Sequence, residues 1–483
     1  MNGVTQYFRS LAVVMLLVGF ARASLAQPAM LSDSAMFPAL TFYELIRQYH
    51  PIVKQANLFG DEAQAVLMQA RGAFDPKITS YYDRKEFGSD LYFDHWRNKL
   101  AVPIWAGGID LTVSYDRNNP AGQYINPEER TPDSGLSGVG ISVPIGQGLF
   151  IDARRNTVRQ ARLTLDMARA DRLKQINKIL FDAAKTYWEW YLAAQQQQFL
   201  TEGYDLANRR FEALQQRALL GDAAIIDTTE ALITVQDRLV QRQQADVDEL
   251  NARLRVSLFL WNVNVQPVEL PALARPQAPA MTPPDTVALQ ALLDQAAQGH
   301  PELLKLNVKN QQLLLEERFR RALIQPQLNL NAMLLSQTPR IDQPYNWSSY
   351  YAFRPQNYKV SVDFVFPLFL RKERGKLREV QIKNRQVVLE QQQVGRDISN
   401  TVRVSYNQLQ TLVQQSAVQQ QVIRNQERLL RAEQQKFDIG ESSLFLVNAR
   451  ETKLIDLRIK GEELKTKFKK AVAELYYVAG TAQ

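Results

Sequence analysis

The sequence contains one succession of elements twice, and this duplication limits the possible folds more than any other feature. One copy begins "FYELIRQYHPIVKQ" and the other "LLDQAAQGHPELLK", so that His50-Pro51 falls on His300-Pro301, about 250 residues later. With no gap, Pro76 then falls on Pro326. The earlier proline of each copy fits the first turn of a new helix, with the histidine before it as the cap. The later proline ends that helix and introduces an extended segment.

After these later prolines, the apolar pattern changes from helical to alternating, which predicts strands at about 77–146 and 326–368. Loop-rich sequences lie between the strands of each copy. The second loop is rich in aromatic residues, as is typical of the interfacial girdle of a membrane β-barrel. An ordinary β-sandwich with aromatic loops is the alternative. The aromatic residues of this loop are Tyr345, Trp347, Tyr350, Tyr351 and Phe353.

Each strand region is followed by a very long helical segment, at about 154–219 and 374–437. Some 65 residues make a helix on the order of 100 Å long, which favours coiled-coil packing over a compact domain. Gly221 and Gly440 end these helices, as expected for a left-handed cap. A helix of about half that length follows each glycine, at about 224–262 and 444–478. The plan of each copy is half-helix, strands, full-length helix, turn and half-helix.

The ends and the middle of the chain complete this organisation. Arg9 precedes an apolar run of about ten residues, and "RASLAQ" offers small residues for cleavage after Ala26. We therefore expect 1–26 to be a signal peptide and the mature chain to be exported. The first repeat then covers 27–270, a proline-rich linker covers 271–285 as an extended, semi-rigid spacer, and the second repeat covers 286–483.

Composition excludes several classes of protein. The chain has no cysteine, so disulfides, thiolate chemistry and a lipid anchor on a processed N-terminal cysteine are excluded. The net charge is +8, but the basic residues alternate with Glu, Asp and Gln along helices, which indicates solvated helix surface rather than nucleic-acid binding. His50, His95 and His300 lack metal-ligand spacing. We expect no enzyme activity and no cofactor.

The strands impose a physical condition if they meet a membrane. Unpaired backbone groups are very costly in hydrocarbon, so the strands must close into a barrel. One chain has too few strands for an open barrel and must recruit identical copies in a closed ring. With a twofold internal repeat, three chains would supply six similar units.

The chain resembles the TolC-like outer-membrane efflux proteins over nearly all of its mature length. The two His-Pro helix starts, the strand pairs, the long helices and the turns at Gly221 and Gly440 carry this resemblance. It implies an α+β membrane protein: a homotrimer with a shared 12-stranded outer-membrane β-barrel, continued by an α-helical coiled-coil periplasmic tunnel. It also implies a passive exit duct for efflux or type I secretion. Such a duct contacts outer-membrane lipid, a periplasmic adaptor protein and an inner-membrane pump of the RND or ABC type.

In that family, side chains around the periplasmic turns constrict the entrance. Asp227 lies at the position of an acidic residue in the family pattern, and Asp222 lies near it. A ring of such carboxylates would favour cations. Acidic residues at a helix start are equally expected from the helix dipole alone.

The second turn departs from the family pattern. Phe437 keeps the aromatic ring three residues before Gly440, but Ser442 replaces the basic residue that would clamp Asp227. We therefore expect a gate without the usual salt-bridge latch. The exposed turns "GDAA" and "GESS", the latter with Glu441, are the expected adaptor contacts.

A second departure lies in "WRNKLAVPIWAGGIDLTVSYDRN", which predicts an additional hairpin about Gly107-Gly108. This hairpin either enlarges the barrel or forms a small sheet outside it. The rival functional class is a non-transporting periplasmic coiled coil that tethers envelope layers, which explains the long helices but not the aromatic-rich strand regions. Drug efflux, metal efflux and protein secretion share the duct architecture, and the sparse Met and His favour no soft-metal export.

Overall fold

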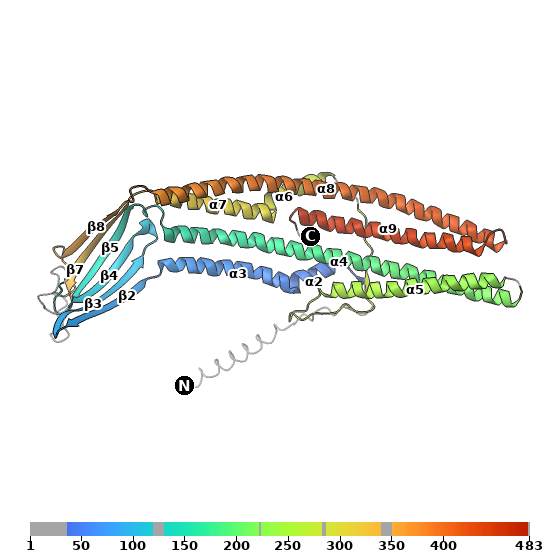
Figure 1. Cartoon of the computed structure of the whole chain (residues 1–483), viewed down its shortest axis with the longest axis horizontal. Helices are drawn as coiled ribbons and strands as arrows, with labels where there is room; N and C mark the ends of the chain where they lie inside the picture. The colour runs from blue at the N-terminus through green and yellow to red at the C-terminus, as the bar shows by residue number, and fades with distance from the viewer. Residues whose placement is uncertain (1–35, 119–129, 222–223, 283–285, 340–349, 482–483) are drawn as a thin grey trace, which may run out of the picture.

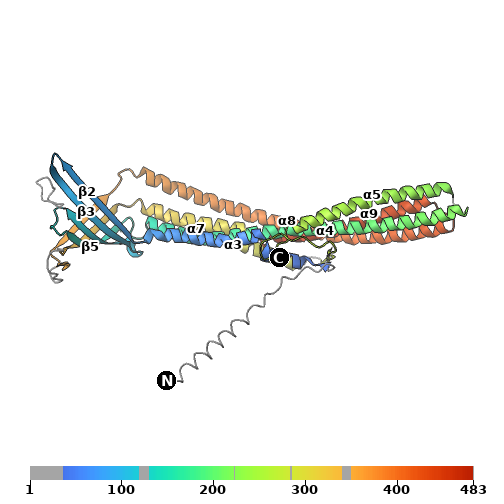
Figure 2. The ribbon, with the colours of Figure 1, turned by 90° about the horizontal axis from the view of Figure 1, so that it is seen from below.

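The structure is a computed structural model that describes residues 36–118, 130–221, 224–282, 286–339 and 350–481. The expected signal peptide, Asp222, Tyr345 and Trp347 lie outside these ranges. The described chain is elongated, with a β-sheet at one end and helices along the rest (Figure 1). A second view at right angles places the sheet at the same end (Figure 2).

Two helices run the whole length of the rod. They are α4 (Ala153–Leu219), with 67 residues, and α8 (Arg371–Asp438), with 68. At 1.5 Å per residue each is about 100 Å long. In each repeat, two shorter helices lie end to end beside the long one, in contact with it (Figure 1). These are α3 (Pro51–Arg71) and α5 (Ile225–Ser257) beside α4, and α7 (Pro301–Ala322) and α9 (Leu444–Val478) beside α8.

The His-Pro steps join consecutive helices. His50 lies between α2 (Ala39–Tyr49) and α3, and its Nδ1 accepts a hydrogen bond from the Ile52 N–H at 3.1 Å. His300 lies between α6 (Thr286–Gly299) and α7, and its Nδ1 accepts from the Glu302 N–H at 3.2 Å. Pro51 and Pro301 follow at the first helical position, where no N–H is needed. Both histidines are therefore helix caps.

The strands form one antiparallel sheet of six, in the order β2-β3-β4-β5-β7-β8. Pairing of β5 with β7 joins the two repeats, and the edge strands β2 and β8 pair with each other nowhere in the described chain. The strands are β2 (Lys77–Phe87), β3 (Asp90–Pro103), β4 (Asp110–Asn118), β5 (Leu136–Gly146), β7 (Gln327–Gln337) and β8 (Tyr358–Val365).

The additional hairpin predicted about Gly107-Gly108 is β3 and β4, with a one-turn 3-10 helix η2 (Ala106–Gly108) between them. It lies inside the sheet between β2 and β5, so that the sheet is enlarged and no separate sheet forms. The resemblance implied twelve strands from three chains, which is four from each. The antiparallel sheet of this chain has six strands instead of four.

The middle of the rod contains the largest aromatic core. Tyr187, Trp190 and Tyr191 of α4 are buried there with Phe42 and Ile46 of α2. A second core around Phe468 lies at the corresponding place in the second repeat, between α6, α8 and α9.

The linker is held against this middle region rather than lying free as a spacer. Its strand β6 (Arg275–Pro276) pairs in parallel with β1 (Met36–Phe37), and Ala274 is buried. The Tyr187 hydroxyl donates to the Phe37 carbonyl at 2.6 Å and accepts from the Gln277 N–H at 3.1 Å. The clasp of β1 and β6 therefore fixes both ends of the first repeat to α4.

None of the helices in the described part of the chain combines the length and the apolar character needed to cross a membrane.

Candidate functional site

Two faces of the sheet differ sharply in chemistry. Residues in register across the strands alternate between the faces, and one row of them runs from Leu100 through Val113 and Val139 to Leu334. This face is apolar and exposed, whereas the opposite face carries Lys99 and Asn331 in the same strands. The exposed apolar side chains of this face include Ile78, Val113, Val139, Ile141, Ile145, Leu334, Tyr358, Val360, Val362 and Phe364.

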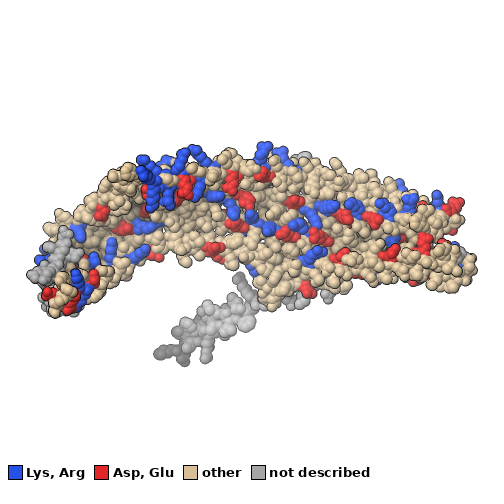
Figure 3. Space-filling model, in the orientation of Figure 1, with Lys and Arg blue, Asp and Glu red and all other residues tan. Residues whose placement is uncertain are grey.

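The boundary between sheet and rod carries aromatic and basic side chains. Phe150 and Phe369 are 80% and 71% exposed just before α4 and α8 begin. Lys and Arg side chains gather where α8 begins (Figure 3). This order, apolar sheet, exposed rings and then positive charge, is typical of a membrane interface with anionic headgroups. The basic residues at this end of α8 are Arg371, Lys372, Arg374, Lys376 and Arg378.

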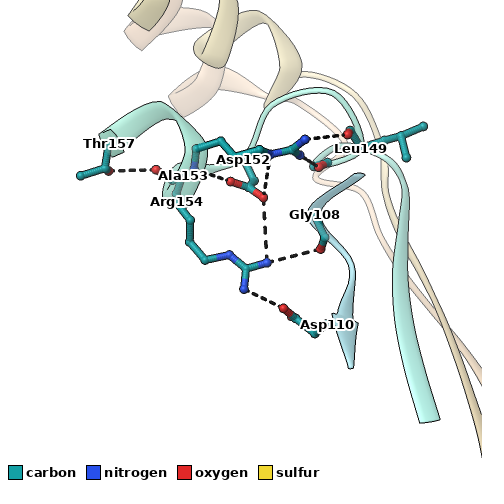
Figure 4. A network of polar contacts seen from close by, with 9 residues as sticks. Gly108, Asp110, Leu149, Asp152, Ala153, Arg154 and Thr157 are labelled. Atoms are coloured by element: carbon teal, nitrogen blue, oxygen red, sulfur yellow. Dashed lines mark hydrogen bonds and ion pairs between the residues drawn. The ribbon is translucent and has the colours of Figure 1, made fainter. Parts of the chain in front are cut away.

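A polar network fixes the turn of the additional hairpin to the start of α4 (Figure 4). Arg154 donates to Asp110 Oδ1 at 2.7 Å and to the Gly108 carbonyl at 3.3 Å. Asp152 caps α4 by accepting from the Arg155 N–H at 2.7 Å, and its other oxygen accepts from Arg155 Nε at 3.2 Å. The Arg155 guanidinium also donates to the carbonyls of Gly148 and Leu149.

The α4–α5 and α8–α9 turns lie together at the end of the rod opposite the sheet (Figure 1). Gly221 and Gly440 adopt φ of +85° and +83°, the left-handed conformation that glycine favours. Neither would place a Cβ near another atom. The sequence predicted these turns; it did not predict their apolar surface.

That surface consists of large aliphatic and aromatic side chains on both turns. Ile225 and Ile226 follow Gly221, and Phe445 follows Gly440, all at least 66% exposed. The full set is Leu219, Leu220, Ile225, Ile226, Ile439, Phe445 and Leu446.

The structure places the predicted aperture residues in different surroundings. Asp227 lies half-buried in the first turn of α5, and Glu441 is exposed. Ser442 donates to Glu433 Oε1 at 2.6 Å, within its own hairpin. Phe437 packs in a cluster with Leu214, Ala231 and Leu444 between the hairpins. Within the described ranges, no hydrogen bond or ion pair joins Asp227 to the second turn.

A buried charge network joins the two hairpins farther along the rod. Glu451 of α9, 3% exposed, accepts two hydrogen bonds at 3.1 Å from the Arg210 guanidinium of α4. Arg238 of α5 lies 3.6 Å from the same carboxylate and donates to Thr452 Oγ1 at 3.2 Å. Burial lowers the pKa of Arg238, and the Glu451 charge opposes this shift.

Sequence reasoning missed this network, although Gly203 was a visible signal in α4. A Cβ at Gly203 would lie 2.7 Å from Arg238 Nη1 and 2.8 Å from Ile455 Cδ1. The missing side chain makes room for Arg238 to reach across to α9. Gly203 inside the long helix α4 therefore marks the position of a buried partner.

Clusters of three or more His, Cys, Asp or Glu side chains with the geometry of a metal site do not occur among the described residues.

Comparisons with known proteins agree on one architecture. A family model described as outer membrane efflux protein matches residues 104–260 and 292–481. No curated protein of similar sequence was found.

Solved structures with the same fold have little sequence identity to this chain. The outer membrane channel CmeC of Campylobacter jejuni is 13% identical, with a TM-score of 0.62 over 92% of this chain and 85% of that one. VceC of Vibrio cholerae is 13% identical, with a TM-score of 0.64 over 92% and 96%. The open-state MtrE channel of Neisseria gonorrhoeae is 11% identical, with a TM-score of 0.63 over 92% and 89%. The fold and the matched segments in both repeats establish that the chain belongs to the outer membrane efflux protein family.

Proposed function

We propose that this outer-membrane efflux protein is the trimeric exit duct of a tripartite efflux or type I secretion system. The observation that carries the proposal is the sheet with one exposed apolar face and one polar face, continued by helices about 100 Å long. A lipid-facing surface, an aqueous lumen and a periplasmic tunnel are the three parts that such a duct requires. The export signal expected at 1–26 fits this location.

Closure by identical copies follows from the two unpaired edges. Successive strands of the sheet run in opposite directions, so β2 and β8 are antiparallel to each other. The β8 strand of one copy can therefore pair with the β2 strand of the next copy as antiparallel neighbours. Such pairing removes every sheet edge from the hydrocarbon region, where an unpaired backbone group costs several kcal/mol.

The apolar turns at the far end fit a periplasmic adaptor, which would connect the duct to an inner-membrane pump of the RND or ABC type. Ile225, Ile226 and Phe445 are too exposed to stabilise the single chain. Contiguous exposed apolar side chains at the tip of a soluble rod mark a protein contact. Asp227 and Glu441 lie beside them and supply negative charge to the same surface.

The buried network of Arg210, Arg238 and Glu451 takes the place of the missing latch at the tip. It holds α9 of the second repeat against α4 and α5 of the first. Opening of the entrance by outward movement of one hairpin would have to break these contacts. The network therefore favours the closed arrangement.

Reconstitution in planar lipid bilayers tests the proposal. We expect stable trimers that insert and give discrete conductance steps. A periplasmic tether without transport function would give stable oligomers and no conductance, and that result would overturn the proposal.

A separate measurement tests the tip. Replacing Ile225 and Phe445 with Asp should abolish capture of the adaptor from the same envelope while leaving the conductance steps intact. The matched variant with Leu at both positions should retain capture, because it preserves the apolar surface. Equal capture by both variants would place the adaptor contact elsewhere.

A further inference from the structure

We propose that three copies of this chain close an eighteen-stranded barrel, with six strands from each chain. The inference rests on the trimeric duct proposed above and deepens it, because it sets the width of the exit. The resemblance to the family implied twelve strands. The additional pair is the hairpin of β3 and β4.

The order of helices and strands around the ring locates this pair. The helices next to the sheet contact one another in the order α3, α4, α7 and α8. Their connected strands follow the same order: β2 continues α3, β5 leads into α4, β7 continues α7, and β8 leads into α8. Only β3 and β4 have no helix of their own, and they fill the space between β2 and β5.

The circumference of the rod favours six strands. Four helices spaced about 9 Å apart cover roughly 36 Å of circumference per chain. Six strands spaced about 4.8 Å apart and tilted by about 40° cover roughly 37 Å, whereas four would cover roughly 25 Å. A sheet of six therefore continues a tunnel of twelve helices without a narrowing at the junction.

The additional hairpin is built into the junction. At Gly108, where φ is +67°, a Cβ would lie 2.7 Å from the Gly148 carbonyl oxygen and 2.9 Å from Asp152 Oδ2. Arg154 holds both Gly108 and Asp110 against the start of α4 (Figure 4). A hairpin that lay outside the barrel would leave these contacts unmade.

Both faces of the hairpin match the sheet around it. On the apolar face, Trp96 and Tyr115 pack edge-to-face with their ring centroids 5.8 Å apart. On the polar face, His95 Nε2 lies 2.5 Å from Asp116 Oδ1. Beside the rod, the hairpin thus continues both the apolar and the polar face of the sheet, as a barrel strand does.

The width of the barrel has a functional consequence. Barrel diameter grows roughly linearly with strand number, so eighteen strands give about one and a half times the diameter of twelve. The outer-membrane segment would then admit solutes as large as the helical tunnel can deliver. Selection of solutes by size would fall to the tips.

Comparison of the intact chain with one deletion variant tests the width. In the variant, residues 90–118 are deleted, so that β2 connects to β5 through the existing loop and four strands per chain remain. A reporter Ser142→Cys on the polar face of β5 is labelled from outside intact cells with maleimide polymers of graded mass. The chain contains no other cysteine. We expect the intact chain to admit larger polymers than the deletion variant, with both proteins trimeric.

The possible outcomes separate the two proposals. Equal polymer cut-offs in two trimeric proteins would overturn the eighteen-stranded barrel and leave the duct intact. Absence of trimers in the intact chain would overturn both.

A second measurement does not depend on the deletion variant folding. Val113→Cys and Ser114→Cys are adjacent on β4 and lie on opposite faces. We expect a lipid-linked maleimide to label only Val113→Cys and a water-soluble maleimide to label only Ser114→Cys. Labelling of both by the water-soluble reagent would place the hairpin outside the barrel and overturn the proposal.

Discussion

The two repeats of this chain are nearly alike in their helices and unlike in their strands. Their long helices have 67 and 68 residues, and each begins its α3 or α7 helix with a His-Pro cap. The first repeat nevertheless contributes four strands to the sheet and the second contributes two. The starts of the long helices differ accordingly. Asp152 caps α4 within a polar network, while α8 begins after Leu370 without a side-chain cap.

This difference teaches that the two parts of the chain are constrained by different requirements. A helix in the rod packs along its whole length against neighbours, so both repeats must keep the same length. A barrel requires only an even number of strands whose faces alternate correctly. A hairpin can therefore be added to one repeat alone, provided that its turn is fixed to the rod.

The largest expected effect concerns the contact between the repeats. Glu451→Ala removes the carboxylate that pairs with the buried Arg210 and Arg238, and it should destabilise the folded protein by about 3–5 kcal/mol. Chemical denaturation in detergent measures this change. The control Glu427→Ala breaks a half-exposed pair with Arg458 inside the second repeat and should cost about 1 kcal/mol or less. Equal effects would show that the link between repeats is no stronger than a surface pair.

A smaller effect is expected at the starts of the two long helices. Gly108→Ala should destabilise the protein by about 2–3 kcal/mol, because the new Cβ meets the Gly148 carbonyl and φ is positive. A Cβ added at Gly375 of α8 would have no neighbouring atom within 4 Å. Gly375→Ala should therefore stabilise the folded protein by about 0.5–1 kcal/mol. Thermal unfolding of both variants tests the contrast. Shifts of the same sign would contradict the view that only the first repeat has a fixed turn there.

The smallest expected effect is the pH dependence of stability that comes from the two histidine caps, and it should be equal in the two repeats. Burial lowers the pKa of His50 and of His300, and at His300 Glu302 opposes and Lys174 adds to the shift. Each cap requires a neutral Nδ1 acceptor, so its contribution is fully present above the ordinary pKa of 6.5 and is lost as pH falls below that value.

We expect a loss on the order of 1 kcal/mol for each cap. Thermal midpoints at pH 7.5 and 5.5 measure it. His50→Asn and His300→Asn keep a cap that does not titrate and should each remove a similar share of the pH dependence. A response confined to one repeat would contradict the equivalence of the two caps.

Much of this architecture could be predicted from the sequence, because the elements are long and repeat. The predicted long helices at 154–219 and 374–437 differ from α4 and α8 by at most three residues at either end. The hydrophobic periodicity and the glycine and proline residues at the ends of elements are local signals. Neither depends on which segments become neighbours in the fold. The place of the additional hairpin could not be predicted, since an alternating pattern does not state which strand lies beside it.

The buried network was beyond prediction for a related reason. Arg210, Arg238 and Glu451 are far apart in sequence, and each resembles the charged surface residues around it. Similarly, Ile225 and Phe445 are large apolar residues in helical sequence, and only the three-dimensional position of the turns shows that they are exposed. Phe437, predicted at the aperture, packs against Leu214 and Ala231 of the other hairpin.

The clasp of β1 and β6 bears on the order in which the chain acquires its structure. Met36 pairs with Arg275, so the first strand can pair only after the whole first repeat has been synthesised. Contacts between residues so distant in sequence form slowly, because a long loop must close first. Until then Phe37 and the aromatic core around Tyr187 stay incompletely covered, so the unfinished chain is most prone to aggregate before residue 275 is in place.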